Sequence, residues 1–217
     1  MEYYNQFHGE IQDGKYVDQT LREYFSDYNY KGIIFDVGAF EPIRISNTYH
    51  FEKNGWTCYC FEANPQGIPL LKEHRKNVFN FAIAEEDKDM ITFNVVLSGS
   101  WTAGYSAINL SDDYKRIFGG FHPSAVTQVS VPQRSLNSII NEYIPDLTHI
   151  DIMSIDIEGG EYNCLLGIDL NKYRPKVMVI ENAMPEKKDI QDYLEKFNYR
   201  LDKQISYNQY YVSNDFF

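Results

Sequence analysis

The sequence predicts one α/β domain in which helices cover both faces of a mostly parallel sheet and the chain ends in an antiparallel hairpin. Short apolar runs alternate with amphipathic segments through the first part of the chain and again after residue 150, an order typical of parallel strands joined by right-handed crossovers. A length of 217 residues fits one domain of this kind. We therefore treat residues 1–217 as a single domain.

Apolar spacing and capping residues place the elements of the first part. An amphipathic helix is expected within residues 15–30, which makes residues 1–30 an N-terminal helical segment. Ser46 and Gly55 suit the start and the stop of the next helix, and Pro65 suits the first turn of a helix that continues to Arg75. Buried strands are expected at residues 32–38, 56–61 and 78–83.

Residues 85–148 break this rhythm, and we interpret them as an inserted segment that shapes the site. Alternating runs predict strands at 90–97 and 125–131, with loops at 98–104 and around Gly119 between them, before a helix at 136–143. The rhythm then returns. Strands are expected at 150–157, 176–180, 199–205 and 209–213, with helices through Leu165 and over 190–197.

Composition excludes several classes of partner. The net charge is −11, with 20 basic against 31 acidic residues, so nucleic acid is a disfavoured partner. The first 14 residues lack the apolar core of a signal peptide, and no stretch approaches the roughly 20 apolar residues of a membrane span. We expect a cytoplasmic protein in which Cys58, Cys60 and Cys164 are reduced and mostly buried.

Carboxylates follow four of the predicted strands, namely Asp36, Glu62, the pair Asp156 and Glu158, and Glu181. In an open parallel sheet, ligands bind outside the carboxyl ends of the strands where the strand order reverses. These side chains are therefore expected to converge on one crevice.

The turn after the first strand fits a cofactor without phosphates. Gly38 lets the backbone approach a ligand, but no G-x-G-x-x-G follows, which disfavours a pyrophosphate cradle. Glu62, at the end of the next strand, can accept hydrogen bonds from both hydroxyls of a ribose. Nicotinamide enzymes and S-adenosylmethionine (SAM) methyltransferases share this device, and the missing phosphate loop favours SAM. The alternatives are a plain strand-end turn with a capping acid at Asp36 and a solvated Glu62.

Asp156 and Glu158 share one face of a strand if the strand continues through them. Like charges so close raise one pKa, which suits a general base. The pair could equally hold a divalent cation or favour the N-terminus of the next helix. We predict no metal, because no further ligand has fixed spacing, and leave a divalent cation open.

Nucleophilic hydrolysis has no support in the sequence. G-x-S-x-G is absent, and none of the five histidines has a serine or cysteine arranged beside it. Only His8 and His122, both in loop-like contexts, are kept as candidates.

Several motifs together resemble the FkbM family of SAM-dependent methyltransferases. The resemblance is carried by Phe35-Asp36-Val37-Gly38-Ala39, Ile45-Ser46-Asn47-Thr48, Cys60-Phe61-Glu62-Ala63-Asn64-Pro65, Asp156-Ile157-Glu158-Gly159-Gly160-Glu161 and Val179-Ile180-Glu181-Asn182. It implies a Rossmann-like class I methyltransferase fold and O-methylation, often of a sugar hydroxyl on a glycan, glycolipid or natural product. Many members have a second glycine where this chain has Glu41-Pro42, and a lysine where it has Ser154.

The resemblance also implies roles for individual residues. It puts Asp36, Gly38 and Ala39 at the cofactor turn and Glu62 on the ribose, and we assign Asn64 and Ala82 to the same cofactor site. Asp156 and Glu158 match the acidic motif near the transfer site, so we expect them to be catalytic. The expected partner is a small-molecule or glycan acceptor, with no membrane span. The rival hypotheses are a nicotinamide-dependent oxidoreductase and a non-catalytic binding protein with the same fold.

Overall fold

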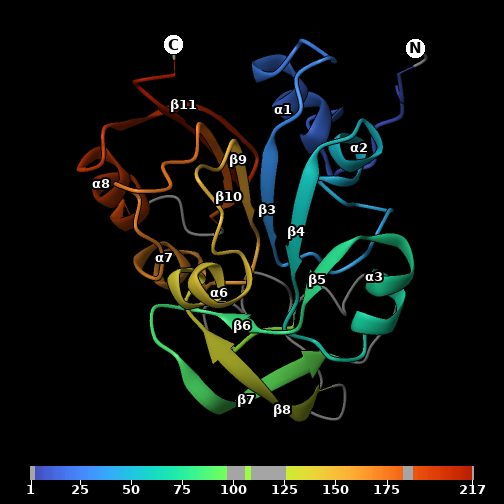
Figure 1. Ribbon diagram of the computed structural model, residues 1–217, viewed down its shortest axis with the longest axis vertical. Helices are drawn as coiled ribbons and strands as arrows, with labels where there is room; N and C mark the ends of the chain where they lie inside the picture. The colour runs from blue at the N-terminus through green and yellow to red at the C-terminus, as the bar shows by residue number, and fades with distance from the viewer. Residues whose placement is uncertain (1–2, 97–105, 109–125, 183–187, 217) are drawn as a thin grey trace.

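A computed structural model of the chain describes residues 3–96, 106–108, 126–182 and 188–216 (Figure 1). The loops expected at 98–104 and around Gly119 lie outside this part. In chain order its elements are β1 (Ile11–Gln12), β2 (Lys15–Tyr16), α1 (Val17–Tyr24), β3 (Ile33–Val37), α2 (Tyr49–Lys53), β4 (Thr57–Phe61), α3 (Ile68–His74), β5 (Asn77–Phe79), β6 (Ala82–Ile83), β7 (Lys88–Val96), β8 (Val126–Arg134), α6 (Leu136–Tyr143), β9 (Ile152–Ile155), α7 (Glu161–Leu166), β10 (Val177–Glu181), α8 (Asp189–Glu195), β11 (Tyr199–Ile205) and β12 (Asn208–Ser213).

The main sheet has seven strands in the order β11-β12-β10-β9-β3-β4-β5. The pairs β10–β9, β9–β3, β3–β4 and β4–β5 are parallel, whereas β12 runs antiparallel to both β10 and β11. The predicted mostly parallel sheet with a C-terminal antiparallel hairpin is therefore confirmed. Along the chain, β4 and β5 are added on one side of β3, and β9 and β10 are added afterwards on its other side. The strand order therefore reverses between β3 and β9.

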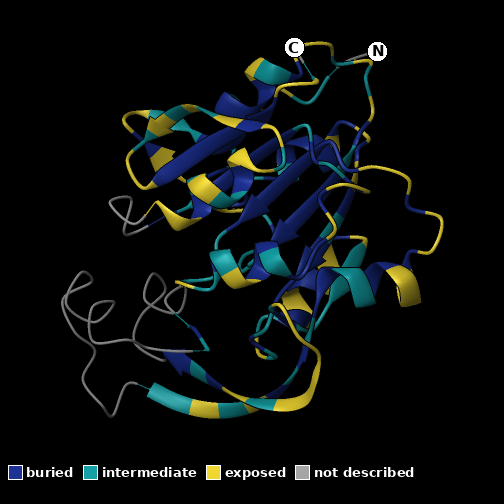
Figure 2. Cartoon of the chain, turned by 90° about the vertical axis from the view of Figure 1, so that its left-hand side faces the viewer, coloured by how far each residue is buried: buried dark blue, intermediate teal, exposed yellow. Residues whose placement is uncertain are grey.

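Side-chain alternation divides the core between the two faces of this sheet. Phe35 and Val37 of β3 pack in a cluster with buried residues of α6, α7 and α8. Ile34, the residue before Phe35, belongs to a second cluster with α1 and α2. Because successive side chains of a strand point to opposite faces, helices cover both faces, as predicted. Figure 2 shows the central strands buried along their length.

A second sheet of three strands, β6-β8-β7, lies below the main sheet in Figure 1. Its strand β6 corrects a prediction, because one continuous strand was expected over residues 78–83. The structure instead ends β5 at Phe79 and pairs β6 in parallel with β8. The Asn80 side chain donates to the backbone oxygens of Glu62 and Ala63, at 2.8 and 3.0 Å, and so turns the chain out of the main sheet.

The N-terminal segment contains the expected helix, α1, and a short hairpin, β1–β2, that the sequence analysis missed. Asp13 and Gly14 form the hairpin turn with φ of 50° and 80°. Two consecutive positive φ angles are the signature of a type I′ turn, for which Asp-Gly is a favoured pair. The signal was therefore present in the sequence.

Two helix starts differ in detail from the prediction. Helix α2 begins at Tyr49 with Thr48 as its N-cap, so the expected cap, Ser46, lies two residues too early, although its hydroxyl accepts the Tyr49 backbone N–H at 3.2 Å. Helix α3 begins at Ile68 rather than at Pro65, which lies in the preceding turn.

All three cysteines are buried and free, as expected. None of the helices in the described residues has the length and hydrophobicity needed to cross a bilayer.

Candidate functional site

A cavity of about 280 Å³ opens between the carboxyl ends of β3, β4 and β9 and the small sheet. Its walls come from Val37, Gly38, Phe40, Phe61, Glu62, Ala63, Phe81, Ala82, Ile83, Ala84, Glu85, Glu86, Lys88, Phe93, Ser106, Ile108, Gln133, Asp156, Ile157, Glu158, Gly159, Gly160 and Asn163. The cavity thus lies where the strand order reverses, the position that open α/β sheets use for ligands.

The lining is rich in carboxylates. It includes Glu62, Glu85, Glu86, Asp156 and Glu158, whereas Lys88 is the only cation among the described lining residues. An anionic ligand such as a pyrophosphate finds little positive charge here, and a cationic ligand is favoured.

Gly38 makes the turn after β3, and the structure gives a sharper reason for this glycine than ligand approach. Its φ is 89°, and a Cβ atom there would lie 1.7 Å from the carbonyl oxygen of Asp156. The N–H groups of Gly38 and Ala39 both donate to the Phe61 carbonyl, at 2.9 and 3.1 Å. Gly38 therefore lets the ends of β3, β4 and β9 meet closely.

Glu62 faces the cavity and also holds its wall. One carboxylate oxygen accepts the N–H of Phe40 at 2.9 Å, and the other accepts the N–H of Asn64 at 2.6 Å. Burial raises the pKa of Glu62, and the two N–H donors act against that rise. A carboxylate oxygen can accept more than one hydrogen bond, so Glu62 keeps acceptor capacity for a ligand hydroxyl.

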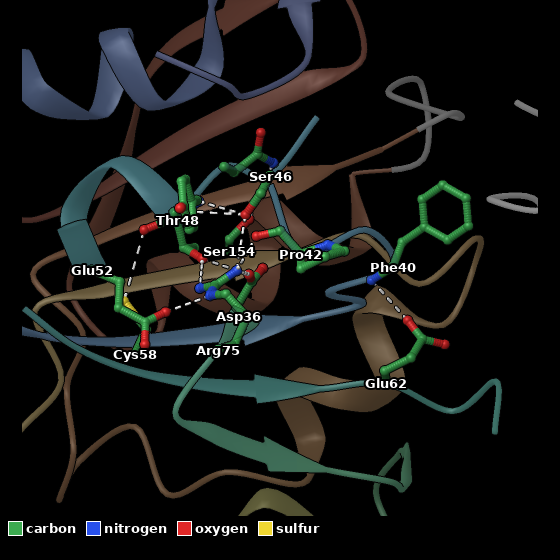
Figure 3. A network of polar contacts seen from close by, with 12 residues as sticks. Asp36, Phe40, Pro42, Ser46, Thr48, Glu52, Cys58, Glu62, Arg75 and Ser154 are labelled. Atoms are coloured by element: carbon green, nitrogen blue, oxygen red, sulfur yellow. Dashed lines mark hydrogen bonds and ion pairs between the residues drawn. The ribbon is translucent and has the colours of Figure 1, made fainter. Parts of the chain in front are cut away.

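The remaining residues predicted for the cofactor are placed unequally. Ala82 lines the cavity, whereas Ala39 and Asn64 are buried beside it and do not line it. Asp36 does not line it either, because alternation in β3 turns its carboxylate toward α2 and α3. The Asp36 carboxylate accepts the Thr48 hydroxyl at 2.6 Å and lies 3.7 Å from Arg75 (Figure 3).

Asp156 and Glu158 do come together, but not on a strand face. Strand β9 ends at Ile155, and the chain turns with φ of 60° at Glu158 and 96° at Gly159. The turn brings one carboxylate oxygen each from Asp156, Glu158 and Glu181 within 4.8 Å of one another. Oxygen ligands in such a group suit a hard divalent cation, although carboxylates also cluster without one.

Burial dominates the acid–base properties of these three groups. It raises the pKa of Asp156, of Glu181 and of Glu158, the last to about 9. The charge of Asp156 raises the pKa of Glu181 further, and the charges of Glu161 and Glu10 do the same for Glu158. Glu158 therefore keeps its proton at neutral pH, and the raised pKa of Asp156 makes that carboxylate a stronger base.

Glu181 was expected in the crevice as a strand-end acid, and the structure adds it to the pair of Asp156 and Glu158. Two further residues, Glu161 and Arg75, had no role in the sequence analysis. Glu161 accepts the N–H groups of Ile157 and Gly159 at 3.1 and 3.0 Å and so shapes the turn, and burial raises its pKa to about 7. Its signal was the acid that opens α7 directly after Gly159-Gly160. Arg75 was noted only as a helix end, and nothing in its local sequence indicates its partners.

Of the two candidate histidines, the structure describes only His8. His8 contacts Tyr4, whose hydroxyl lies 2.5 Å from Nε2, and it does not line the cavity. His122 lies outside the described residues.

Comparisons with known proteins give a family and a distant structural likeness. The sequence matches the methyltransferase FkbM domain over residues 36–201. The chain is similar to a solved precorrin-6y C5,15-methyltransferase from Geobacter metallireducens, with 12% identity and a TM-score of 0.44 over 95% of this chain and 92% of that chain. At this level the likeness carries no information about activity. No curated protein matches the chain.

Proposed function

The chain belongs to the FkbM family of methyltransferases, and from that premise we propose that it transfers the methyl group of SAM to a hydroxyl oxygen of a sugar, glycan or related small molecule. The observation that carries the proposal is one cavity with Glu62 on its wall and the cluster of Asp156, Glu158 and Glu181 beside Gly38.

The donor groups of the cavity fit SAM. Glu62 offers carboxylate oxygens for the two ribose hydroxyls, and Ala82 and Ile83 offer an apolar wall for the adenine ring. The acidic cluster suits the positive charge of the ammonium and sulfonium groups. Ala39 and Asn64 would contribute through the backbone that they hold in place, and Asp36 through its neighbours.

Bound in this cavity, SAM would supply a methyl group that is already activated by the positive sulfur. The protein then has two tasks, which are to align the acceptor hydroxyl and to take its proton. Alignment of reacting groups contributes several kcal/mol, on the order of 7 or more in the best cases. The carboxylate of Asp156 would take the proton, worth roughly 10²–10⁴-fold in rate, because the pKa of about 9 keeps Glu158 protonated at neutral pH.

The acidic cluster supports two versions of this role. In the first, Asp156 acts directly as the base beside the protonated Glu158. In the second, the cluster holds a divalent cation that orients the acceptor hydroxyl. We favour the first version, because a shared proton already accounts for the close approach of the carboxylates.

The two rival functions make different demands. An oxidoreductase that uses a nicotinamide dinucleotide needs a phosphate cradle with several glycines directly after the first strand. There the described lining has Gly38 alone, and it includes one lysine. A binding protein without catalysis requires only the residues that bind the cofactor. Carboxylates with raised pKa values in the same cavity are typical of catalytic sites.

Calorimetric titration with S-adenosylhomocysteine and with NAD tests the cofactor. We expect binding of the first and none of the second, and the reverse result would overturn the proposal.

A panel of sugars and glycans with labelled SAM then tests the transfer. In the direct-base version, EDTA leaves turnover unchanged and Asp156→Asn lowers the maximal rate with little effect on cofactor affinity. Loss of turnover in EDTA with recovery in magnesium would establish the cation version. Full activity of the Asp156→Asn, Glu158→Gln double variant would refute both.

A further inference from the structure

Arg75 sits at the centre of a buried polar network on the face of the main sheet that carries Asp36 (Figure 3). Its side chain is fully buried just after α3. The guanidinium donates to the hydroxyl of Thr48 at 2.6 Å, the hydroxyl of Ser46 at 3.0 Å, the carbonyl of Pro42 at 3.3 Å and the carboxylate of Glu52. Together with the ion pair to Asp36, these contacts join β3, α2 and the chain between them to one cation.

The chain between β3 and α2, residues 38–47, is the part that this network holds. It is neither helix nor regular strand, and Phe40 and Ile45 have φ of 35° and 55°, a region that such residues rarely adopt. Its backbone is tied at the ends, where Gly38 donates to Phe61 and Ser46 donates to Ile43. Its middle is held from outside by the bond between Arg75 and the Pro42 carbonyl.

The same segment forms a wall of the cavity. Gly38 and Phe40 line the cavity, and the Phe40 N–H is one of the two donors that fix the Glu62 carboxylate. A shift of residues 38–47 therefore moves the wall and the ribose-binding acid together.

We propose that Arg75 is a positioning residue, which fixes residues 38–47 in the conformation that binds the S-adenosyl group without touching that group itself. The inference rests on the proposed function, since it takes the cavity as the S-adenosyl site. Only a planar guanidinium has five N–H donors to reach several acceptors at once, so lysine would keep the charge and lose the geometry.

The test compares Arg75→Lys with Arg22→Lys. Like Arg75, Arg22 is buried and lies outside the cavity lining. It donates to the Phe25 carbonyl at 2.9 Å and to His50 at 3.2 Å, and neither partner belongs to residues 38–47. We expect both substitutions to lower the thermal midpoint. Only Arg75→Lys should weaken S-adenosylhomocysteine binding, at least tenfold by calorimetry, and speed amide hydrogen exchange within residues 38–47.

A milder pair covers the case in which Arg75→Lys fails to fold. Ser46→Ala removes one acceptor of Arg75 and the acceptor of the Tyr49 N–H at the start of α2. Ser135→Ala removes a similar acceptor at the start of α6, where Ser135 accepts the N–H of Ser138 at 3.2 Å. We expect Ser46→Ala, but not Ser135→Ala, to weaken the binding of S-adenosylhomocysteine severalfold.

The outcomes separate the two proposals. If the wild-type protein does not bind S-adenosylhomocysteine, the proposed function fails and this inference fails with it. If the wild type binds and Arg75→Lys or Ser46→Ala binds as tightly, or if each variant and its control lose affinity equally, only the role of Arg75 is overturned.

Discussion

The carboxylate of Glu62 is the group whose removal tests the cofactor site most directly. It accepts two backbone N–H groups, from Phe40 and Asn64, and it lines the cavity. Glu62→Ala would remove these wall contacts together with any contact to a ligand. Glu62→Gln is the better perturbation, because it keeps the shape and replaces one acceptor oxygen with an amide donor.

The expected loss follows from the number of hydrogen bonds at stake. A hydrogen bond to a charged group contributes roughly 1.5–3 kcal/mol. Loss of one ribose hydroxyl contact therefore weakens S-adenosylhomocysteine binding about tenfold or more, since about 1.4 kcal/mol is a factor of ten. The side-chain amide that Glu62→Gln introduces also faces one backbone N–H, so a lower thermal midpoint should accompany the change.

A cycle that varies protein and ligand together isolates the ribose contact. Calorimetry on wild type and Glu62→Gln, each with S-adenosylhomocysteine and with its 2′-deoxy analogue, should give a coupling energy of about 1.5–3 kcal/mol. Glu85→Gln is the matched control, because Glu85 also lines the cavity but is exposed and was not predicted to meet the ribose. Its coupling should be near zero.

The reasoning fails if wild type and Glu62→Gln discriminate equally between the two ligands. Glu62 would then be a wall residue whose partners are Phe40 and Asn64 alone.

Two further predictions concern the turns around the site. Gly38→Ala adds a clash with the Asp156 carbonyl to the strain of a positive φ, whereas Gly14→Ala, at φ of 80° with nothing within 4 Å of the new Cβ, adds the strain alone. By calorimetric or optical melting we expect a loss of about 1 kcal/mol for Gly14→Ala and at least twice that for Gly38→Ala; equal losses would contradict the packing argument. Glu158 has a folded-state pKa of about 9, above its ordinary value of 4.5, so its contribution to stability is present below pH 4.5 and is lost as the pH rises toward 9. Glu158→Gln should therefore stabilise the ligand-free protein increasingly from pH 5 to 9, by about 1 kcal/mol or a few degrees after solvent screening, and a pH-independent difference in melting temperature would rule this out.

The sequence was sufficient for the fold class, and it indicated strand ends that line the cavity. The alternation of apolar runs with amphipathic segments predicts parallel strands joined by helices, because strands and helices differ in side-chain period and length and because short connections leave few topologies. The strand-end acids were also visible in the sequence, since Asp36, Glu62 and Glu181 each end or follow a short apolar run.

Tertiary structure alone decided what each of these acids meets. Asp36 was predicted at the cofactor turn, and the structure instead pairs it with Thr48 and Arg75. Arg75 is distant in sequence, and no local pattern marks it. The reason for Gly38 is likewise non-local, since the obstructing atom is the carbonyl oxygen of Asp156. Periodicity predicts which face of a strand a side chain occupies. The partners of that side chain come from segments distant in sequence, so they are known only once the whole chain has packed.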